Sequence, residues 1–481
     1  MLPRLRVAHA MDGFLASVAR LKQRGTMSCL QRLDAVSYEL CLVGDAASAI
    51  AHLHPTPTLR DEARALALRL GAIVQDVNVS SDLAHELASE PAPDDEGRIV
   101  RAALLDEFTW DGAFLADDGA RAHVSALQNE IRELEWTLKD DASMDLLVVK
   151  RHALASALGF DSYAQLATSK LSLGTPDNVA AFLQRACDAL APYRASTEIS
   201  LKHSPPPLEL TVDAAVDGLT CLAARTFGLT LTRVPEPSYH PTVVELVVSD
   251  QAGARLGTLG LDLVPRPGKT AGTALYPLRS RLSSRPDDAA ACIVALDLVP
   301  NHSGLCALLH EFGHALQQLS SVTAYQHLSG ARGPLDLVEV PSLLLERLAW
   351  EPAVAALFAP GAAGLDSLVE ARRVVHVRDL AAQVKLAQLD LELFGPSPRP
   401  FSDVWPAALS GAVSHLAGPY GGGYHAYVFA HCLAGELWTK AFASDAFGPG
   451  GKALVAGALR KGGTARVDDF ATSVDVKRML A

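Results

Sequence analysis

The sequence predicts a mainly α-helical protein: a large helical body with a small β element just before a histidine-bearing helix. Apolar residues recur at three- and four-residue spacing over long stretches, among them 27–54, 58–77 and 117–141, as in amphipathic helices. The period then changes. Residues 243–265 read as two strands around a glycine-bearing turn, and 291–300 is a short apolar run of β character.

Helical spacing returns after this β element. The expected helices are 305–320, 338–358, 366–394, 402–416 and 424–443, with a glycine loop at 418–423. Further upstream, Thr175 followed by Pro176 and Asp177 predicts a helix start, because a capping side chain, an early proline and an early acid favour the first turn. No repeat or low-complexity linker marks a sharp boundary. We expect a first segment at 1–32, an N-terminal helical region at 33–240 and a catalytic region at 241–481.

The composition excludes several classes of protein. Apolar residues make up 49% and charged residues 20%, and the net charge is -12, so no overall basic field would attract nucleic acid. No run approaches the roughly 18 apolar residues that a membrane-spanning helix needs. The seven cysteines are odd in number and include no CxxC pair, which argues against a disulfide framework and a thiolate zinc site.

The first 32 residues are basic in an otherwise acidic chain. Six arginines and lysines face a single acid, Asp12, and the apolar residues have near-helical spacing. Such a start is typical of an organelle transit segment, and an ordinary first helix has the same pattern. Both interpretations stay open.

The stretch "HEFGH" is the main chemical signal. His310 and His314 are four apart, so on a helix both rings can reach one zinc ion. Glu311 would then lie beside the metal and accept a proton from its water. The alternative is an amphipathic core helix that happens to contain two histidines. A catalytic zinc site also needs a third protein ligand.

The stretch "GPLDLVEVPSLLLERLAW" at 333–350 supplies candidates for that ligand. Asp336, Glu339 and Glu346 are acids in an otherwise apolar sequence, and carboxylates facing a core are costly unless paired or bound to metal. We assign Glu339 as the third ligand, and Glu346 and Asp336 as partners that hold the imidazoles.

"LLHEFGHAL" followed by "DLVEVPSLLLE" resembles the thimet-oligopeptidase family of zinc metallopeptidases. The resemblance implies a helical body split by a deep substrate channel, one zinc ion per chain on His310, His314 and Glu339, and Glu311 as general base. "HLAGPYGGGYHAY" at 415–427 is similar to the family's glycine loop. It implies that His415, Tyr424 and Tyr427 are catalytic residues that contact substrate and polarise the scissile carbonyl. It also implies that Tyr420, Gly421 and Gly422 bind substrate.

Two departures from the family pattern stand out. Gln317 occupies a position where the family usually has a histidine that is not a ligand, and the family's tryptophan–aspartate–tyrosine block is missing near 193–210. The expected function is a monomeric zinc endopeptidase acting on short peptides or unfolded leader segments. The closest likeness, to the family's mitochondrial branch, implies the mitochondrial matrix. The alternatives are a general oligopeptidase, a catalytically retired binding protein of the same fold, and a cytoplasmic location.

Overall fold

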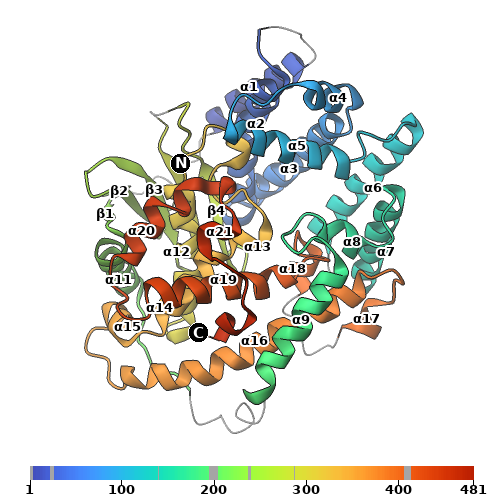
Figure 1. Ribbon diagram of the computed structural model, residues 1–481. Coiled ribbons are helices and arrows are strands. Elements are labelled where there is room, and N and C mark those ends of the chain that lie inside the picture. Colours follow the sequence, from blue (N-terminus) through green and yellow to red (C-terminus); the bar gives the residue numbers. More distant parts are fainter. Residues whose placement is uncertain are drawn as a thin grey trace.

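The computed structural model describes residues 4–21, 26–138, 140–193, 204–236, 240–285, 288–405 and 413–480. It confirms a mainly helical fold with a small sheet (Figure 1). The N-terminal half consists of the helices α1 (Arg4–Leu21), α2 (Cys29–Leu53), α3 (Pro57–Asn78), α4 (Ser81–Ser89), α5 (Asp95–Trp110), α6 (Asp118–Thr137), α7 (Asp141–Ala157), α8 (Tyr163–Thr168), α9 (Pro176–Leu190) and α11 (Val212–Leu222).

Local sequence sets several of these helix starts. The Ser28 side chain accepts a hydrogen bond from the Gln31 amide and completes a capping box at α2. At α9, Thr175 accepts from the Asn178 amide and Pro176 begins the helix, as the sequence predicts. Part of the expected transit segment, residues 1–3 and 22–25, lies outside the described residues, and α1 packs its fully buried Phe14 into the core of the first helices.

The sheet has five strands in the order β1-β2-β3-β5-β4. Strands β3 and β5 are parallel, and the other neighbours are antiparallel. The predicted strand pair at 243–265 corresponds to β2 and β3, and the apolar run at 291–300 to β5. The two edge strands were not expected from the sequence. The strands are β1 (Thr230–Arg233), β2 (Val244–Ser249), β3 (Arg255–Asp262), β4 (Thr273–Arg279) and β5 (Ala290–Leu296).

Helices return after β5, and two of the expected ones differ. The expected helix 338–358 is interrupted at Trp350 and Glu351, because Pro352 begins a new helix. Of the expected helix 402–416, residues 406–412 lie outside the described residues, and the flanks form two short helices. The helices are α12 (His302–Ser320), α13 (Leu335–Val338), α14 (Val340–Ala349), α15 (Pro352–Phe358), α16 (Leu368–Leu393), α17 (Phe401–Val404), α18 (Val413–Ala417), α19 (His425–Ala441), α20 (Gly450–Ala456) and α21 (Val467–Phe470).

Two large hydrophobic cores and one small cluster organise the described residues. One core lies among α1 to α5, at the top of Figure 1, and contains Phe14, Leu33 and Phe108. The larger core runs from Val124 in α6 through the sheet and α12 to the C-terminal helices. It therefore crosses the boundary expected at 240, and the division into 33–240 and 241–481 stays a prediction.

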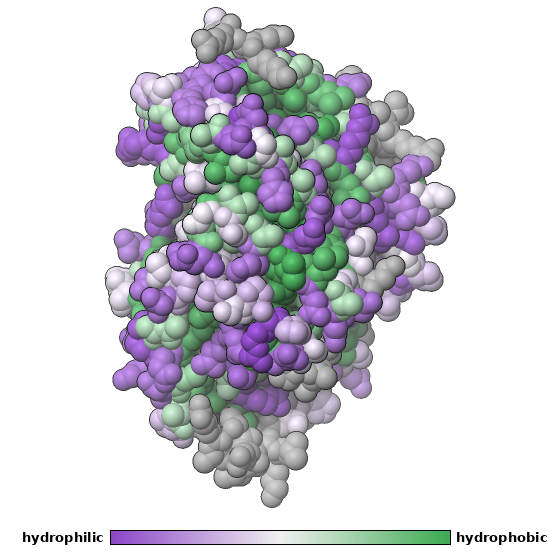
Figure 2. All heavy atoms as spheres, turned by 90° about the vertical axis from the view of Figure 1, so that its right-hand side faces the viewer, coloured by the Kyte–Doolittle hydropathy of each residue, from purple (hydrophilic) through white to green (hydrophobic). Residues whose placement is uncertain are grey.

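The surface in Figure 2 carries hydrophilic side chains over most of the face, with hydrophobic ones visible between them. Among the described residues, no helix combines the length and apolar character required to cross a membrane.

Candidate metal centre

Helix α12 carries both histidines of the HEFGH motif and packs against β5 and α14. Asn301 begins the helix by accepting a hydrogen bond from the Gly304 amide at 3.0 Å. One turn apart, the rings of His310 and His314 have their centroids 5.0 Å from each other. The helix thus places two imidazoles side by side at its surface.

Glu339 lies where α13 ends and α14 begins, and its carboxylate faces both rings. Its Oε2 atom is 3.5 Å from His310 Nε2 and 3.4 Å from His314 Nε2. The ligand atoms of the three residues lie within 4.8 Å of one another, and they are the one such group of three among the described residues. Two imidazole nitrogens and one carboxylate oxygen form a donor set that suits a catalytic zinc ion.

Further side chains hold these three residues in place. His310 Nδ1 is 2.5 Å from Glu346 Oε1, and a carboxylate on the second nitrogen is the usual partner of a metal-bound imidazole. Ser342 Oγ donates to Glu339 Oε2 at 2.9 Å, and the Tyr420 hydroxyl donates to Glu339 Oε1. Both oxygens of Glu339 are therefore oriented by hydrogen bonds.

The electrostatics of the site favour a cation. Burial would lower the pKa of His310, but the hydrogen bond to Glu346 and the charges of three neighbouring glutamates raise it to about 10. Burial would likewise raise the pKa of Glu339, yet His314 and His310 lower it well below its ordinary range. Positive charge between these groups is thus strongly stabilised.

Glu311 follows His310 on α12 and is 4% exposed. Its charge contributes to the raised pKa of Tyr276, which burial and two nearby carboxylates bring to about 12. Its charge also contributes to the raised pKa of His310, the residue that it follows in the sequence.

The aromatic residues of the glycine loop gather next to Glu339. The rings of Tyr420 and Tyr427 stack with centroids 4.7 Å apart, and Tyr424 lies 5.2 Å from Tyr427. His415 lies 5.9 Å from Tyr427 and is exposed, and burial of part of its ring lowers its pKa. Burial raises the pKa of all three tyrosines, that of Tyr424 to about 12, so their hydroxyls stay protonated and able to donate.

Three predicted residues are placed differently from expectation. Asp336 is buried and accepts from the Ser172 amide at 2.8 Å, while its Oδ1 atom has no hydrogen-bond partner among the described residues. No hydrogen bond joins it to either imidazole in this part of the chain. Gly421 and Gly422 are buried, and the Gly422 amide donates to Asp390. Both glycines face protein and not an open surface.

Sequence reasoning missed several residues that shape the site. Ser342 stands three residues after Glu339, and Asp390 is one of two acids, with Glu392, in the stretch "KLAQLDLEL", so the sequence does not single it out. Arg151 gave no signal either, since its partners lie far away in the sequence. Of the two departures from the family pattern, Gln317 is buried on α12. The other concerns the tryptophan–aspartate–tyrosine block expected near 193–210, where residues 194–203 lie outside the described residues.

Comparison with known proteins shows similarity to peptidases. The family described as "Peptidase family M3" matches residues 196–403, which include the HEFGH helix and Glu339. This part of the chain is similar to the M3 peptidases. The mitochondrial intermediate peptidase of Arabidopsis thaliana is 30% identical over 63% of this chain and 53% of the relative, and that of Mus musculus is 24% identical over 72% and 60%. The predicted family resemblance is confirmed, and the chain spans about half to three fifths of the length of these M3 relatives.

Solved structures support the fold of this M3 relative. An oligoendopeptidase F from Bacillus anthracis aligns with a TM-score of 0.64 at 13% identity, covering 100% of this chain and 95% of that one. A carboxypeptidase from Pyrococcus furiosus aligns with a TM-score of 0.63 at 13% identity, covering 95% and 98%. Both confirm the helical body with its small sheet, while the deep channel stays a prediction.

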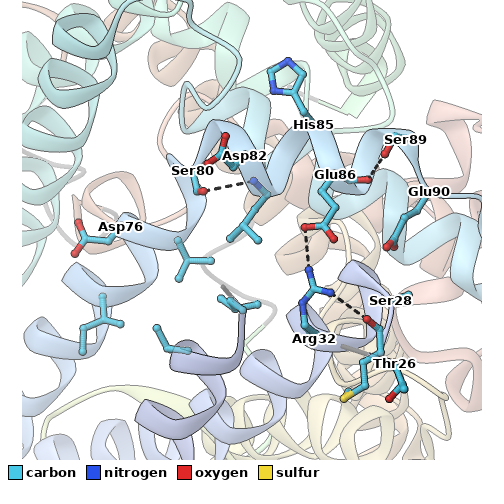
Figure 3. Close-up of a pocket in the computed structure, with 16 residues that line it drawn as sticks. Thr26, Ser28, Arg32, Asp76, Ser80, Asp82, His85, Glu86, Ser89 and Glu90 are labelled. Carbon is cyan, nitrogen blue, oxygen red and sulfur yellow. Dashed lines mark hydrogen bonds and ion pairs between the residues drawn. The ribbon is translucent and has the colours of Figure 1, made fainter. Parts of the chain in front are cut away.

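A hollow of about 1430 Å³, apart from the metal centre, lies among α1 to α4 (Figure 3). Arg32 crosses it, donating to Glu86 at 2.9 Å and to the Met27 carbonyl at 3.0 Å. The hollow is bordered by Leu21 and Thr26, which flank residues outside the described part of the chain. We therefore assign no ligand to it.

Proposed function

We propose that the protein is a zinc-dependent endopeptidase that hydrolyses short peptides or unfolded leader segments. The observation that carries the proposal is the convergence of His310, His314 and Glu339, with Glu311 next to them. Zinc held by these three residues would polarise the scissile carbonyl and lower the pKa of the attacking water. The metallopeptidase class is supported by the M3 relatives.

The residues around the ligands divide the remaining chemistry. Glu311 accepts the proton of the attacking water and passes it to the leaving amine. Glu346 fixes the ring of His310 and keeps its Nε2 directed toward the other two metal-binding residues. Tyrosine hydroxyls donate to the oxyanion that develops on the carbonyl.

Tyr427 is the best placed of the three tyrosines for that donation. The Tyr420 hydroxyl already donates to Glu339, and Tyr424 is only 4% exposed. Tyr427 is half-buried and stacks on Tyr420 beside Glu339. We assign Tyr427 as the oxyanion donor, Tyr420 as a support of Glu339, and His415 as a substrate contact at the exposed edge.

Metal analysis combined with a peptide assay tests this function. The purified protein should contain about one zinc per chain, cleave a quenched fluorescent peptide and lose activity in chelator. Glu339→Ala should remove the metal, because one of three protein ligands is lost. A protein that binds zinc and cleaves no peptide would point to the retired binding protein.

The names of the relatives support a mitochondrial matrix location and leader trimming. Incubating the enzyme with a once-cut mitochondrial precursor and reading the product masses tests the substrate class. A single trimmed product supports leader specificity. Equal cleavage of unrelated peptides would instead make the protein a general oligopeptidase.

A further inference from the structure

Two buried charged side chains contact the two ends of the glycine loop 418–423. Arg151 of α7 and Asp390 of α16 are each 1% exposed. Burying a charge is costly unless the group is paired and hydrogen-bonded, so the partners of both side chains indicate what they are for.

Arg151 binds the backbone that enters the loop. Its guanidinium donates to three successive carbonyls, those of Leu416, Ala417 and Gly418, at 2.5, 2.6 and 2.9 Å. It also donates to Glu135 at 2.8 Å, and this carboxylate balances the charge of the guanidinium. The planar fork of an arginine suits this set of parallel acceptors, and a lysine could not span them.

Asp390 binds the backbone that leaves the loop. One carboxylate oxygen accepts from the Gly422 amide at 2.8 Å and the other from the Tyr424 amide at 3.0 Å. The loop is thus held at its carbonyls by a guanidinium and at its amides by a carboxyl group, whose pKa burial raises to about 7.

The glycines make this grip possible. A Cβ atom at Gly421 would collide with the Arg151 guanidinium, and Gly422 has a φ of 73°, a left-handed conformation that favours glycine. These two positions, expected from the family resemblance to contact substrate, therefore serve close packing and a tight turn.

We propose that Arg151 and Asp390 are positioning residues that fix the glycine loop, so that Tyr420 reaches Glu339 and the rings of His415, Tyr424 and Tyr427 stay gathered at the metal centre. The contacts of Arg151 and Asp390 with the loop backbone, which we call the loop clamp, belong to the structure itself. Only the effect of this clamp on catalysis rests on the proposed function. Tyr420 is the link, because it is in the clamped loop and donates to a metal ligand.

Asp390→Asn tests the proposal with the smallest change in shape. The asparagine keeps one acceptor and places an amide donor against a backbone donor, so one of the two loop contacts is lost. The control is Glu392→Gln, which neutralises an exposed acid two residues further along the same helix. Hydrogen exchange of the loop amides, zinc affinity, and kcat and KM are measured for both variants.

In Asp390→Asn we expect exchange at 418–424 to accelerate at least tenfold and kcat to fall at least tenfold. One zinc should still bind per chain, and KM should change less than kcat. Arg151→Lys should move the same readouts in the same direction. Glu392→Gln should match the unmodified protein.

If hydrogen exchange of the loop amides is unchanged in Asp390→Asn, Asp390 does not hold the loop. If exchange is faster but kcat equals that of the Glu392→Gln control, holding the loop has no positioning role in catalysis. If the unmodified protein cleaves no peptide, the proposed function fails and zinc affinity decides the inference. A tenfold loss of affinity in Asp390→Asn would then support the link through Tyr420. Equal affinity in the two variants would reject it.

Discussion

At the scale of single residues, the metal centre depends on carboxylates that do different work in one small space. Glu339 faces both imidazoles, and Glu346 contacts the far side of one ring. Glu311 follows His310 on α12 and forms no ion pair with a residue in the described part of the chain. Removing each charge should therefore give a different result.

Glu311→Gln should keep zinc and lose turnover. The amide has nearly the same shape but cannot accept the proton of the attacking water, so kcat should fall by about 10²- to 10⁴-fold. Metal analysis and the peptide assay measure the two effects separately. Glu370→Gln, an exposed acid on α16, is the control, and a Glu311→Gln enzyme as active as this control would contradict the assignment of the base.

Glu346→Gln should weaken metal binding. The charged acceptor on His310 Nδ1 becomes neutral, so the ring is a poorer ligand and is oriented less firmly, and zinc affinity should fall by about 10- to 100-fold. Competition with a coloured chelator measures this. An affinity equal to that of the unmodified protein would show that the 2.5 Å contact does not tune the metal site.

At the scale of elements, the centre exists because α12 and α14 approach each other closely. Gly313 lies on α12 between the two histidines, and a Cβ atom there would be 2.6 Å from the Ser342 Cα atom and 2.7 Å from the Pro341 carbonyl oxygen of α14. Glycine therefore allows the contact that brings Glu339 to the imidazoles.

Gly313→Ala should push these helices apart. The overpacking should cost about 1–3 kcal/mol of stability and lower zinc affinity, because Glu339 moves relative to His310 and His314. Gly44→Ala on α2 is the matched control. A Cβ atom there meets only Leu70 at 3.9 Å, so stability should rise by about 0.5–1 kcal/mol. Thermal melting with and without chelator measures both variants. Equal melting temperatures of Gly313→Ala and Gly44→Ala would contradict the argument that α12 and α14 are in close contact at Gly313.

The elements of the fold differ in how far the sequence could predict them. Helix α12, strands β2, β3 and β5 and the ligand Glu339 carry local signals: a period, an apolar run, or an acid among apolar residues. The edge strands β1 and β4 lack such a run, and β4 contains Pro277, which is tolerated at a sheet edge. The Arg151 clamp joins residues 265 to 267 positions apart, and no single sequence reveals that contact.

At the scale of the whole molecule, the sheet and the helices that follow it share one hydrophobic core with α6 to α11, whereas α1 to α5 form another. The buried polar groups of the large core thus affect the stability of both halves of the chain. His425, at the start of α19, is one of them. It is 2% exposed, and its Nε2 atom has no hydrogen-bond partner in the described part of the chain.

Burial lowers the pKa of His425 from 6.5 to about 4. The unfolded chain, with the ordinary pKa, therefore binds a proton more readily than the folded chain between these values. This stability contribution is fully present above pH 6.5 and is lost as the pH falls toward 4. In His425→Gln, which does not titrate, that part of the acid loss should disappear.

Thermal melting of the unmodified protein and His425→Gln at pH 7.5 and pH 5.0 checks this. The stability difference between the two proteins should shift by about 2 kcal/mol in favour of the variant at the lower pH. His123→Gln, on the exposed side of α6, should show no such shift. A pH-independent difference between His425→Gln and the unmodified protein would mean that this imidazole titrates alike in the folded and unfolded chain, and that its burial does not couple the core to pH.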